Sequence, residues 1–569
     1  MPFDSKPPEE KKSMPSASSR AGFDSLLIRR YILINATEHG GTVQPKSVLG
    51  MILAEKPELR NEVLQLKGEI ERMVPDINRL SLNEQRRELD KLGGHTPVTK
   101  QERKGLPDLE LGREGFVVRF APNPDGALHL GNARPAVLCD EYAKKYKGKF
   151  ILRFDDTDPK IKTPEKQFYK WIREDLKWLG VKIHKEIISS KRLKIYYKYA
   201  DDLVKMGKAY VCTCGEEWKK LIANNKACQC RLLDVKSQQK RWKAMLAYKY
   251  KEKAAVLRIK TDLDAKNPAV RDWAAMRIVD KPSHPFSKAH LWPLYNFASA
   301  IDDKLLNVTH IFRGQEHSTN ETKQRYVYQY FRWQYPTVIT LGRFSMSDMV
   351  LSKSLIREGI EKKQFGGWDA PSLGTLRALK RRGFSPDAIR NIIIDIGPKP
   401  SDVTVSFENL ASYNRKIIDS YANRYFFVQE PRKIELSGIK LTKVKIPVHP
   451  DNDKVTRTLD VGKAVYIEAA DYESYNGLEV RLKNLCNVRL QNGKAVYTGT
   501  EIKPIPKIQW VPLKNTHIRV LVPQKVVNGI IEKGVETAKP GSVAQFERFG
   551  FVRLEKVRPG NVVAIFGHQ

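Results

Sequence analysis

The segment at 119–134 constrains the fold of this chain more than any other part of it. It reads RFAPNPDGALHLGNAR and follows the apolar run at 116–118, so it has the form of a strand, a tight turn and the start of a helix. Proline, aspartate and glycine shape the turn, which delivers His129 and Gly131 to the first turn of the helix. Backbone N–H groups at a helix start bind phosphate, a glycine lets a base or ribose approach the backbone, and histidine can donate to a phosphate oxygen. The segment therefore predicts a nucleotide site, although the HxGx pattern alone also fits any buried histidine near a turn.

Two further segments carry charged groups where a parallel sheet would gather them. Residues 150–159 read FILRFDDTDP, an apolar strand that ends in Asp155, Asp156 and Asp158, and residues 349–354 read MVLSKS. Ligands of an open parallel sheet bind beyond the carboxyl ends of its strands, so we expect the acids and the lysine loop to converge on one crevice. Helix capping and turn formation are the alternative for the acids, and they suit Asp156 and Asp158 better than Asp155.

Together these segments resemble the signatures of the class I aminoacyl-tRNA synthetases. Residues 129–132 (HLGN) match the HIGH signature except at the last position, where Asn132 replaces histidine. Residues 350–354 (VLSKS) match KMSKS at the last three positions. Because lysine is missing at 350, we expect Lys353 to carry more of the phosphate stabilisation.

The resemblance narrows to the glutamyl and glutaminyl branch of this family, in its archaeal and eukaryotic type. The segments at 294–303 (LYNFASAIDD) and 308–317 (VTHIFRGQEH) carry it together with those above, and the match runs from about residue 115 to the C-terminus. It implies that ATP activates an amino acid as its adenylate with release of pyrophosphate, and that the aminoacyl group then passes to the 3′ end of a tRNA. Activation only when tRNA is bound and a monomeric protein are implied as well.

The resemblance also implies how the nucleotide is held. Positioning and charge stabilisation dominate both steps, so Lys353, together with Mg²⁺, is expected to stabilise the phosphates and His129 to place the nucleotide. Gly314 is expected under the adenine, and Ser352 as a loop former and phosphate donor. The nucleotide-binding residues implied in this way are Pro122, His129, Gly131, Asn132, Gly314, Ser352 and Lys353.

The arginines point to glutamate as the amino acid. Arg119 and Arg313 are expected to hold its γ-carboxylate, which needs cationic donors once it leaves water. Glutaminyl enzymes carry a small uncharged residue at the position of Arg313, so a glutaminyl-tRNA synthetase is the nearest alternative and this arginine opposes it. Asp155 matches the acid that receives the α-ammonium group, and Tyr295 matches a residue that lines the same pocket.

Two other functions stay open on the sequence. One is a tRNA-binding paralogue without activity, which the presence of the motif residues opposes. The other is a tRNA-modifying glutamyl transferase, whose relatives are short, whereas this chain has about 150 further residues that resemble barrels. Charging of tRNA(Gln) besides tRNA(Glu) depends on how the barrels read one anticodon base; Arg481, Asn484 and Trp510 are candidates that fit a core or a surface position equally well.

A cysteine cluster predicts a structural metal site. Cys212, Cys214, Cys228 and Cys230 form two CxC pairs within 19 residues, a spacing that can place four thiolates around a tetrahedral Zn²⁺. The resemblance agrees, because family members often carry a zinc knuckle here. Buried or redox-paired thiols are the alternative.

The charge of the chain favours a polyanionic partner. It has 100 Lys and Arg against 65 Asp and Glu, a net charge of +35 spread over the whole length, which suits a nucleic acid. A solvated basic surface is the alternative. Nothing resembles a signal peptide or a membrane span, and six cysteines in 569 residues are no disulfide framework, so we expect a cytoplasmic protein.

The expected fold is multidomain, α/β plus β. A helical N-terminal appendage precedes a Rossmann-type doubly wound catalytic domain with an insertion, and antiparallel β-barrels follow at the C-terminus. The resemblance implies that the insertion binds the acceptor end of tRNA and that the barrels bind the anticodon arm. The expected parts are a disordered tail (1–20), the helical appendage (21–110), the first catalytic half (111–204), the acceptor-binding insertion (205–290), the second catalytic half with the lysine loop (291–354), a helical stem-contact region (355–415) and the barrels (416–569).

Overall fold

The computed structural model describes residues 24–38, 41–56, 59, 62–94, 105–110 and 115–569. The chain forms two compact units, Met1–Arg103 and Lys104–Gln569, each of which is described by itself. The predicted disordered tail at 1–20 lies outside the described residues. Within them, no helix combines the length and the apolar character that crossing a membrane requires.

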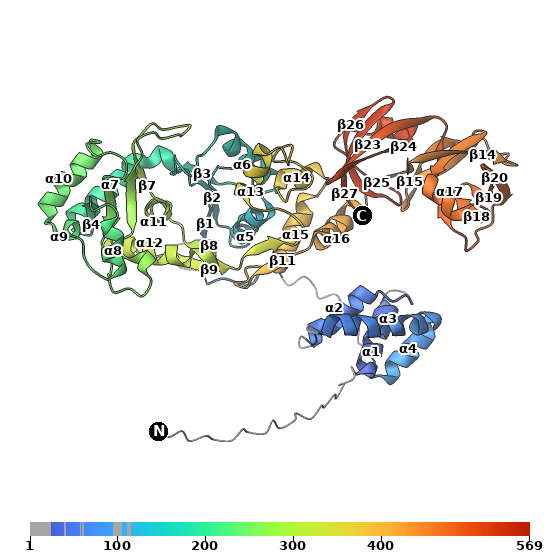
Figure 1. Cartoon of the computed structure of the whole chain (residues 1–569), viewed down its shortest axis with the longest axis horizontal. Coiled ribbons are helices and arrows are strands. Elements are labelled where there is room, and N and C mark those ends of the chain that lie inside the picture. The colour runs from blue at the N-terminus through green and yellow to red at the C-terminus, as the bar shows by residue number, and fades with distance from the viewer. Residues whose placement is uncertain (1–23, 39–40, 57–58, 60–61, 95–104, 111–114) are drawn as a thin grey trace, which may run out of the picture. The chain divides into compact units, whose positions relative to one another are not determined.

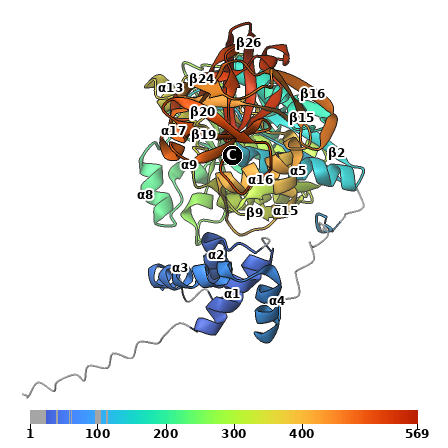
Figure 2. The ribbon, with the colours of Figure 1, turned by 90° about the vertical axis from the view of Figure 1, so that its right-hand side faces the viewer.

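The first unit is a bundle of short helices, shown in blue in Figures 1 and 2. Buried Ile32, Leu66 and Ile70 belong to its core. A capping box begins the last helix, because Ser81 N–H donates to the Glu84 carboxylate at 2.8 Å while the Ser81 hydroxyl accepts from Glu84 N–H. The helices are α1 (Ser25–Glu38), α2 (Pro45–Glu55), α3 (Val63–Arg79) and α4 (Leu82–Lys91).

A parallel five-stranded sheet forms the centre of the second unit. Its order is β3-β2-β1-β8-β9, so the chain leaves β1 toward one edge and later returns at β8 toward the other. The carboxyl ends of β1 and β8 are therefore the topological switch point, where open α/β sheets bind ligands. The strands are β1 (Val117–Phe120), β2 (Lys149–Phe154), β3 (Lys185–Ile188), β8 (His310–Gly314) and β9 (Thr337–Leu341).

Helices cover this sheet as the doubly wound fold predicts. Helix α5 (Leu130–Lys145) follows β1, α6 (Lys166–Trp178) follows β2, and α12 (Ser318–Tyr330) connects β8 to β9 (Figure 1). Strands buried on both faces read as continuous apolar runs, which is why FILRF in β2 contains a single charged residue, Arg153.

An insertion between β3 and β8 carries its own antiparallel sheet, β4-β5-β6-β7, and its own core around Trp242 and Trp292. Its elements are α7 (Leu193–Lys205), β4 (Ala209–Cys212), α8 (Glu217–Ala223), α9 (Gln229–Leu232), α10 (Val235–Leu246), β5 (Val256–Ile259), β6 (Ala274–Ile278), β7 (Leu291–Pro293) and α11 (Tyr295–Leu305).

A mainly helical stretch follows β9. Its elements are β10 (Phe344–Met346), α13 (Lys353–Glu361), α14 (Leu376–Arg381), α15 (Pro386–Ile396), β11 (Val403–Val405) and α16 (Phe407–Ile418). Short 3-10 helices lie at Ser189–Arg192, Pro268–Val270, Gln315–His317 and Lys533–Thr537.

The C-terminal part consists of two seven-stranded sheets and a hairpin, which confirms the predicted barrels. In the first sheet, β12 (Asn423–Tyr425) and β13 (Phe427–Gln429) are one residue apart in sequence and yet lie at opposite ends of the strand order, so the sheet curls round to bring its edges together. Not every pairing is antiparallel. Strands β23 and β27 pair in parallel, and β24, β25 and β26 lie between them in the sequence.

The first sheet also contains β23 (Asn515–Val522), β24 (Lys525–Glu532), β25 (Val543–Phe546), β26 (Gly550–Arg558) and β27 (Asn561–His568). The second contains β14 (Pro431–Ser437), β17 (Ala464–Glu468), β18 (Glu479–Leu482), β19 (Cys486–Gln491), β20 (Lys494–Gly499), β21 (Lys507–Ile508) and β22 (Val511–Pro512). The hairpin is β15 (Lys443–His449) and β16 (Asn452–Asp460), and one helix, α17 (Ala469–Tyr475), completes this part.

The three barrel residues left open by the sequence all have internal partners or conformational roles. Trp510 is fully buried and its indole N–H donates to the Lys483 carbonyl at 2.9 Å, so it is a core residue. Arg481 donates to Asn487 at 2.8 Å, and Asn484 occupies a turn with φ of 59°, a conformation that asparagine tolerates.

Candidate functional site

A cavity of about 860 Å³ opens at the switch point between β1 and β8. Its wall contains every residue that the sequence predicted for the nucleotide and amino acid sites: Arg119, Pro122, His129, Gly131, Asn132, Asp155, Tyr295, Arg313, Gly314, Ser352 and Lys353. Segments more than 200 residues apart in sequence thus meet in one place, as the parallel topology requires. Their chemical roles remain proposals.

The turn after β1 and the start of α5 build one end of the cavity. His129 is the residue before α5, and its backbone N–H donates to the Asn132 side chain at 3.2 Å, so Asn132 caps the helix. A Cβ at Gly131 would lie only 3.0 Å from the His129 ring, so glycine leaves the room that the imidazole occupies. Burial, with Lys353 nearby, lowers the pKa of His129 to about 4, which keeps the ring neutral at pH 7. Its buried Nδ1 has no partner among the described residues.

The lysine loop closes onto the same turn. Helix α13 begins at Lys353, and the Ser352 hydroxyl accepts from Leu355 N–H at 3.5 Å as its cap. The Lys353 ammonium donates to the Asn123 carbonyl at 2.9 Å and to Asp125 at 2.8 Å. Burial lowers the pKa of Lys353, and Asp125 opposes that shift.

Two further contacts hold this closed arrangement. Arg357 of α13 pairs with Glu165 at 2.8 Å. A Cβ at Gly126 would come within 2.6 Å of the Trp368 ring, so the turn and the stretch after α13 pack in direct contact only because residue 126 has no side chain.

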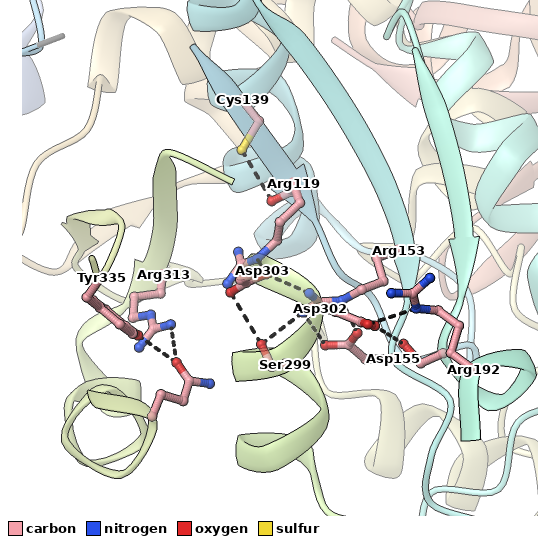
Figure 3. Close-up of polar contacts among 12 residues, drawn as sticks. Arg119, Cys139, Arg153, Asp155, Arg192, Ser299, Asp302, Asp303, Arg313 and Tyr335 are labelled. Carbon is pink, nitrogen blue, oxygen red and sulfur yellow. Dashed lines mark hydrogen bonds and ion pairs between the residues drawn. The ribbon is translucent and has the colours of Figure 1, made fainter. Parts of the chain in front are cut away.

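A buried charge network lies behind the cavity wall, to which it contributes Arg119 and Asp155 (Figure 3). Arg153 donates to Asp155 at 2.6 and 3.2 Å and to Asp303 at 2.6 Å, while Arg119 donates to the same Asp303 oxygen at 3.2 Å. Burial alone would raise the pKa of Asp303, but the two arginines outweigh it and hold the pKa below its ordinary value. Burial raises the pKa of Asp155, and Arg153 opposes that shift.

Sequence reasoning missed Arg153 and Asp303, although both lie inside motif segments. The available signal was a charged residue inside an apolar element. Arg153 interrupts a buried strand and Asp303 lies on the buried side of α11, and a charge in such a place must be paired.

The cavity wall also carries Arg313, on the strand next to that of Arg119, and Tyr295. Arg313 lies near the end of β8, is 6% exposed, and its Nη2 donates to Gln324 at 3.0 Å. Tyr295 begins α11 and is 38% exposed, so its ring borders the opening of the cavity. The Glu316 carboxylate folds over Gly314, because a Cβ added to this glycine would lie only 2.4 Å from it. Gly314 is the residue expected beneath the adenine.

Asp158 forms a turn, as the alternative expected, whereas the partners of Asp156 are distant side chains. Buried Asp156 accepts from Tyr169 and from Ser190 at 2.6 Å each. Asp158 accepts from the backbone N–H groups of Lys160 and Ile161, which is a turn.

The four predicted cysteines lie together at the start of the insertion. The sulfurs of Cys212, Cys214 and Cys228 lie within 4.8 Å of one another, a group that could hold a metal ion. Cys230 Sγ is 3.4 Å from Cys214 Sγ and accepts from Arg241 at 3.0 Å. Soft thiolates at this mutual distance suit a tetrahedral Zn²⁺, and the cationic Arg241 offsets part of their negative charge.

The cavity itself offers less to a metal. Among the residues that the structure describes, the cysteine cluster is the one group of three or more metal-binding side chains within mutual reach. We expect the ATP phosphates to supply most of the ligands of the predicted Mg²⁺, because magnesium in such sites binds one or two carboxylates together with substrate phosphates.

Comparison with known proteins agrees with these features. Residues 116–420 match the model of tRNA synthetases class I (E and Q), catalytic domain, and residues 422–503 and 507–555 match two models of the anti-codon binding domain of the same class. The chain is 50% identical to the glutamate–tRNA ligase of Pyrococcus furiosus and 41% identical to that of Methanosarcina mazei, over 95% and 96% of this chain and 99% of each relative. The chain therefore belongs to the class I tRNA synthetases of the glutamyl and glutaminyl (E and Q) family.

Proposed function

We propose that this chain is a glutamate–tRNA ligase, which activates glutamate with ATP and transfers the glutamyl group to the 3′ end of tRNA(Glu). The observation that carries the choice of glutamate is the state of Arg313. Its guanidinium is buried in the cavity wall, forms no ion pair among the described residues, and has Nε and Nη1 without a hydrogen-bond partner there. A buried cation with free donors needs an anionic ligand, and the γ-carboxylate of glutamate supplies one.

The remaining wall residues suit the two ends of this substrate. Asp155, fixed by Arg153, receives the α-ammonium group, while Arg119 and Tyr295 complete the amino acid pocket. The glutamate carboxylate then attacks the α-phosphate of ATP, and pyrophosphate leaves. No side-chain nucleophile is needed, because positioning and charge stabilisation account for the catalysis.

The turn after β1 and the lysine loop receive the nucleotide. Neutral His129 donates to a phosphate oxygen, and Lys353 exchanges Asp125 for the phosphates. Pro122, Gly131, Asn132, Gly314 and Ser352 shape the surface on which the nucleotide lies. Bound Mg²⁺ would add positive charge at the phosphates.

Several finer features belong to the same proposal. Cys212, Cys214, Cys228 and Cys230 bind a structural Zn²⁺, and tRNA(Gln) is a possible second substrate. The protein acts as a cytoplasmic monomer.

Aminoacylation of defined tRNA(Glu) and tRNA(Gln) transcripts, with glutamate and glutamine in turn, tests the proposal. We expect glutamate to be charged and glutamine to be rejected. Charging of glutamine alone would favour a glutaminyl enzyme, and no charging or pyrophosphate release would favour the inactive paralogue.

Arg313→Cys tests the pocket. We expect kcat/KM for glutamate to fall by roughly tenfold or more, because one charge-assisted pair is lost. Arg86→Cys, an exposed arginine on α4, is the control that should leave glutamate charging unchanged. Undiminished glutamate charging by the Arg313 variant would contradict the assignment of the pocket.

A further inference from the structure

The two arginines of the amino acid pocket differ in their charge balance. Arg119 shares the carboxylate of Asp303 with Arg153. Arg313, by contrast, has a neutral partner, the side-chain oxygen of Gln324. The positive charge still available to a ligand therefore resides mainly on Arg313.

Gln324 is placed so that it orients Arg313 without neutralising it. The side chain is fully buried on α12, and its Oε1 accepts from Arg313 Nη2 at 3.0 Å and from the Tyr335 hydroxyl at 2.6 Å. Because a guanidinium only donates, the amide atom that faces it must be the oxygen. With Nη2 engaged in this way, Nε and Nη1 remain for a ligand in the cavity.

Tyr335 fixes the amide from the other side, and Figure 3 shows it beside Arg313. Burial raises the pKa of Tyr335 to about 12, so the hydroxyl stays protonated and donates at neutral pH. The guanidinium of Arg325 stacks on the Tyr335 ring at 4.5 Å and is itself paired with Glu321 at 2.7 Å, which holds the ring in place.

We propose that Gln324 is a positioning residue that sets the specificity of this site for glutamate: its neutral oxygen, fixed by Tyr335, aims Arg313 at the substrate while leaving the charge of Arg313 free. The inference rests on the proposed glutamate–tRNA ligase activity. A carboxylate in place of the amide would keep the shape and the acceptor but would cancel that charge, so the substrate's γ-carboxylate would lose its counter-ion.

The decisive variant is Gln324→Glu, assayed by aminoacylation of tRNA(Glu) with glutamate and with glutamine. We expect KM for glutamate to rise roughly ten- to hundredfold, with KM for ATP and kcat at saturating glutamate changed little, because the affected contact forms equally in the ground and transition states. The preference for glutamate over glutamine should fall by a similar factor. Gln329→Glu, the same change at an exposed position of α12, is the matched control and should behave like the wild type.

Two further variants separate charge from orientation. Gln324→Met removes the acceptor but adds no charge, so we expect a smaller rise in KM for glutamate and a retained preference over glutamine. Tyr335→Phe, which removes the hydroxyl that fixes the amide, should have an effect of the same kind as Gln324→Met.

The outcomes are distinguishable. If the wild type charges no glutamate, the proposed function itself fails. If the wild type is active and Gln324→Glu keeps its KM for glutamate, the inference is overturned. It is equally overturned if Gln324→Glu and Gln324→Met lose activity alike, with ATP and tRNA parameters and thermal midpoint shifting together, because that pattern means a packing role only.

Discussion

At the scale of the residue, the partner of a side chain decides what the side chain can do. Arg119 and Arg313 are both buried, yet within the part of the chain that the structure describes only Arg119 has a carboxylate in contact. Lys353, which is half-buried, is also paired, with Asp125 at 2.8 Å. We therefore expect substitutions of these cations to affect different kinetic parameters, although all three are basic groups in one wall.

For Lys353→Ala we expect kcat of aminoacylation to fall by roughly a hundredfold, while KM for glutamate stays within about twofold. The reason is that the ammonium is proposed to act on charge developing at the departing pyrophosphate, beyond the α-phosphate that the amino acid attacks. Steady-state kinetics with each substrate varied in turn measure this. Lys362→Ala, at the exposed end of the same helix, serves as the control, and a selective rise in KM for glutamate would contradict the assignment.

At the scale of the element, the ends of short helices and strands bring side chains from separate parts of the sequence together. Strand β4 ends at Cys212, and α9 begins after Cys228, so two separate element ends deliver the clustered sulfurs. A metal would therefore tie together parts of the insertion that are connected otherwise by a loop and one short helix.

We expect the purified protein to contain about one zinc ion per chain, and Cys212→Ser or chelation to lower the thermal midpoint by several degrees, since the ion stabilises only the folded arrangement. Metal analysis and thermal unfolding measure both quantities. Cys486→Ser, which alters a thiol far along the sequence, should leave the zinc content unchanged. Protein free of zinc, with Cys212→Ser as stable as the wild type, would refute the site.

Individual helices and strands are the part of the fold that could be predicted from the sequence. The strand-turn-helix at 119–134 and the strand at 150–154 are local patterns, and both are present as β1 with α5 and as β2. The place of β8 between β1 and β9 was not predicted, because a local apolar pattern indicates a strand but not its neighbours in the sheet. Pairings such as Arg153 with Asp303, 150 residues apart, were missed because a local pattern shows that a charge needs a partner but not which one. The limits of the domains remain predictions.

At the scale of the whole second unit, the last strand ties the β-sheets to the helical stretch. Arg382, which follows α14, donates to the Phe566 carbonyl at 3.2 Å and to Gly567. His568 is 1% exposed, and its Nε2 lies 3.0 Å from the Asn414 amide of α16. Because that amide donates, the imidazole must be neutral at this nitrogen.

This contact makes stability depend on pH. Burial lowers the pKa of His568 to about 4, below the value of about 6.5 expected in the unfolded chain, so the unfolded state binds the extra proton between these values. The contribution to stability is fully present above about pH 6.5 and is lost as the pH falls toward 4. His568→Gln, which keeps a hydrogen-bonding side chain without this titration, should flatten the fall in thermal midpoint between pH 6.5 and 4. Parallel pH profiles for variant and wild type would show that another group causes the fall.

The pairing of Lys353 with Asp125 carries one more consequence. An ammonium that already has a counter-ion must give up that contact before it binds a phosphate, so part of its attraction to a bound triphosphate is offset. When the bond to the α-phosphate breaks, the departing pyrophosphate gains negative charge. It then competes more strongly with Asp125 for the Lys353 ammonium. Under the proposed function, Asp125 would therefore weaken the contact of Lys353 with bound ATP more than its contact with the developing pyrophosphate, which is the condition under which a contact speeds a reaction instead of merely tightening a complex.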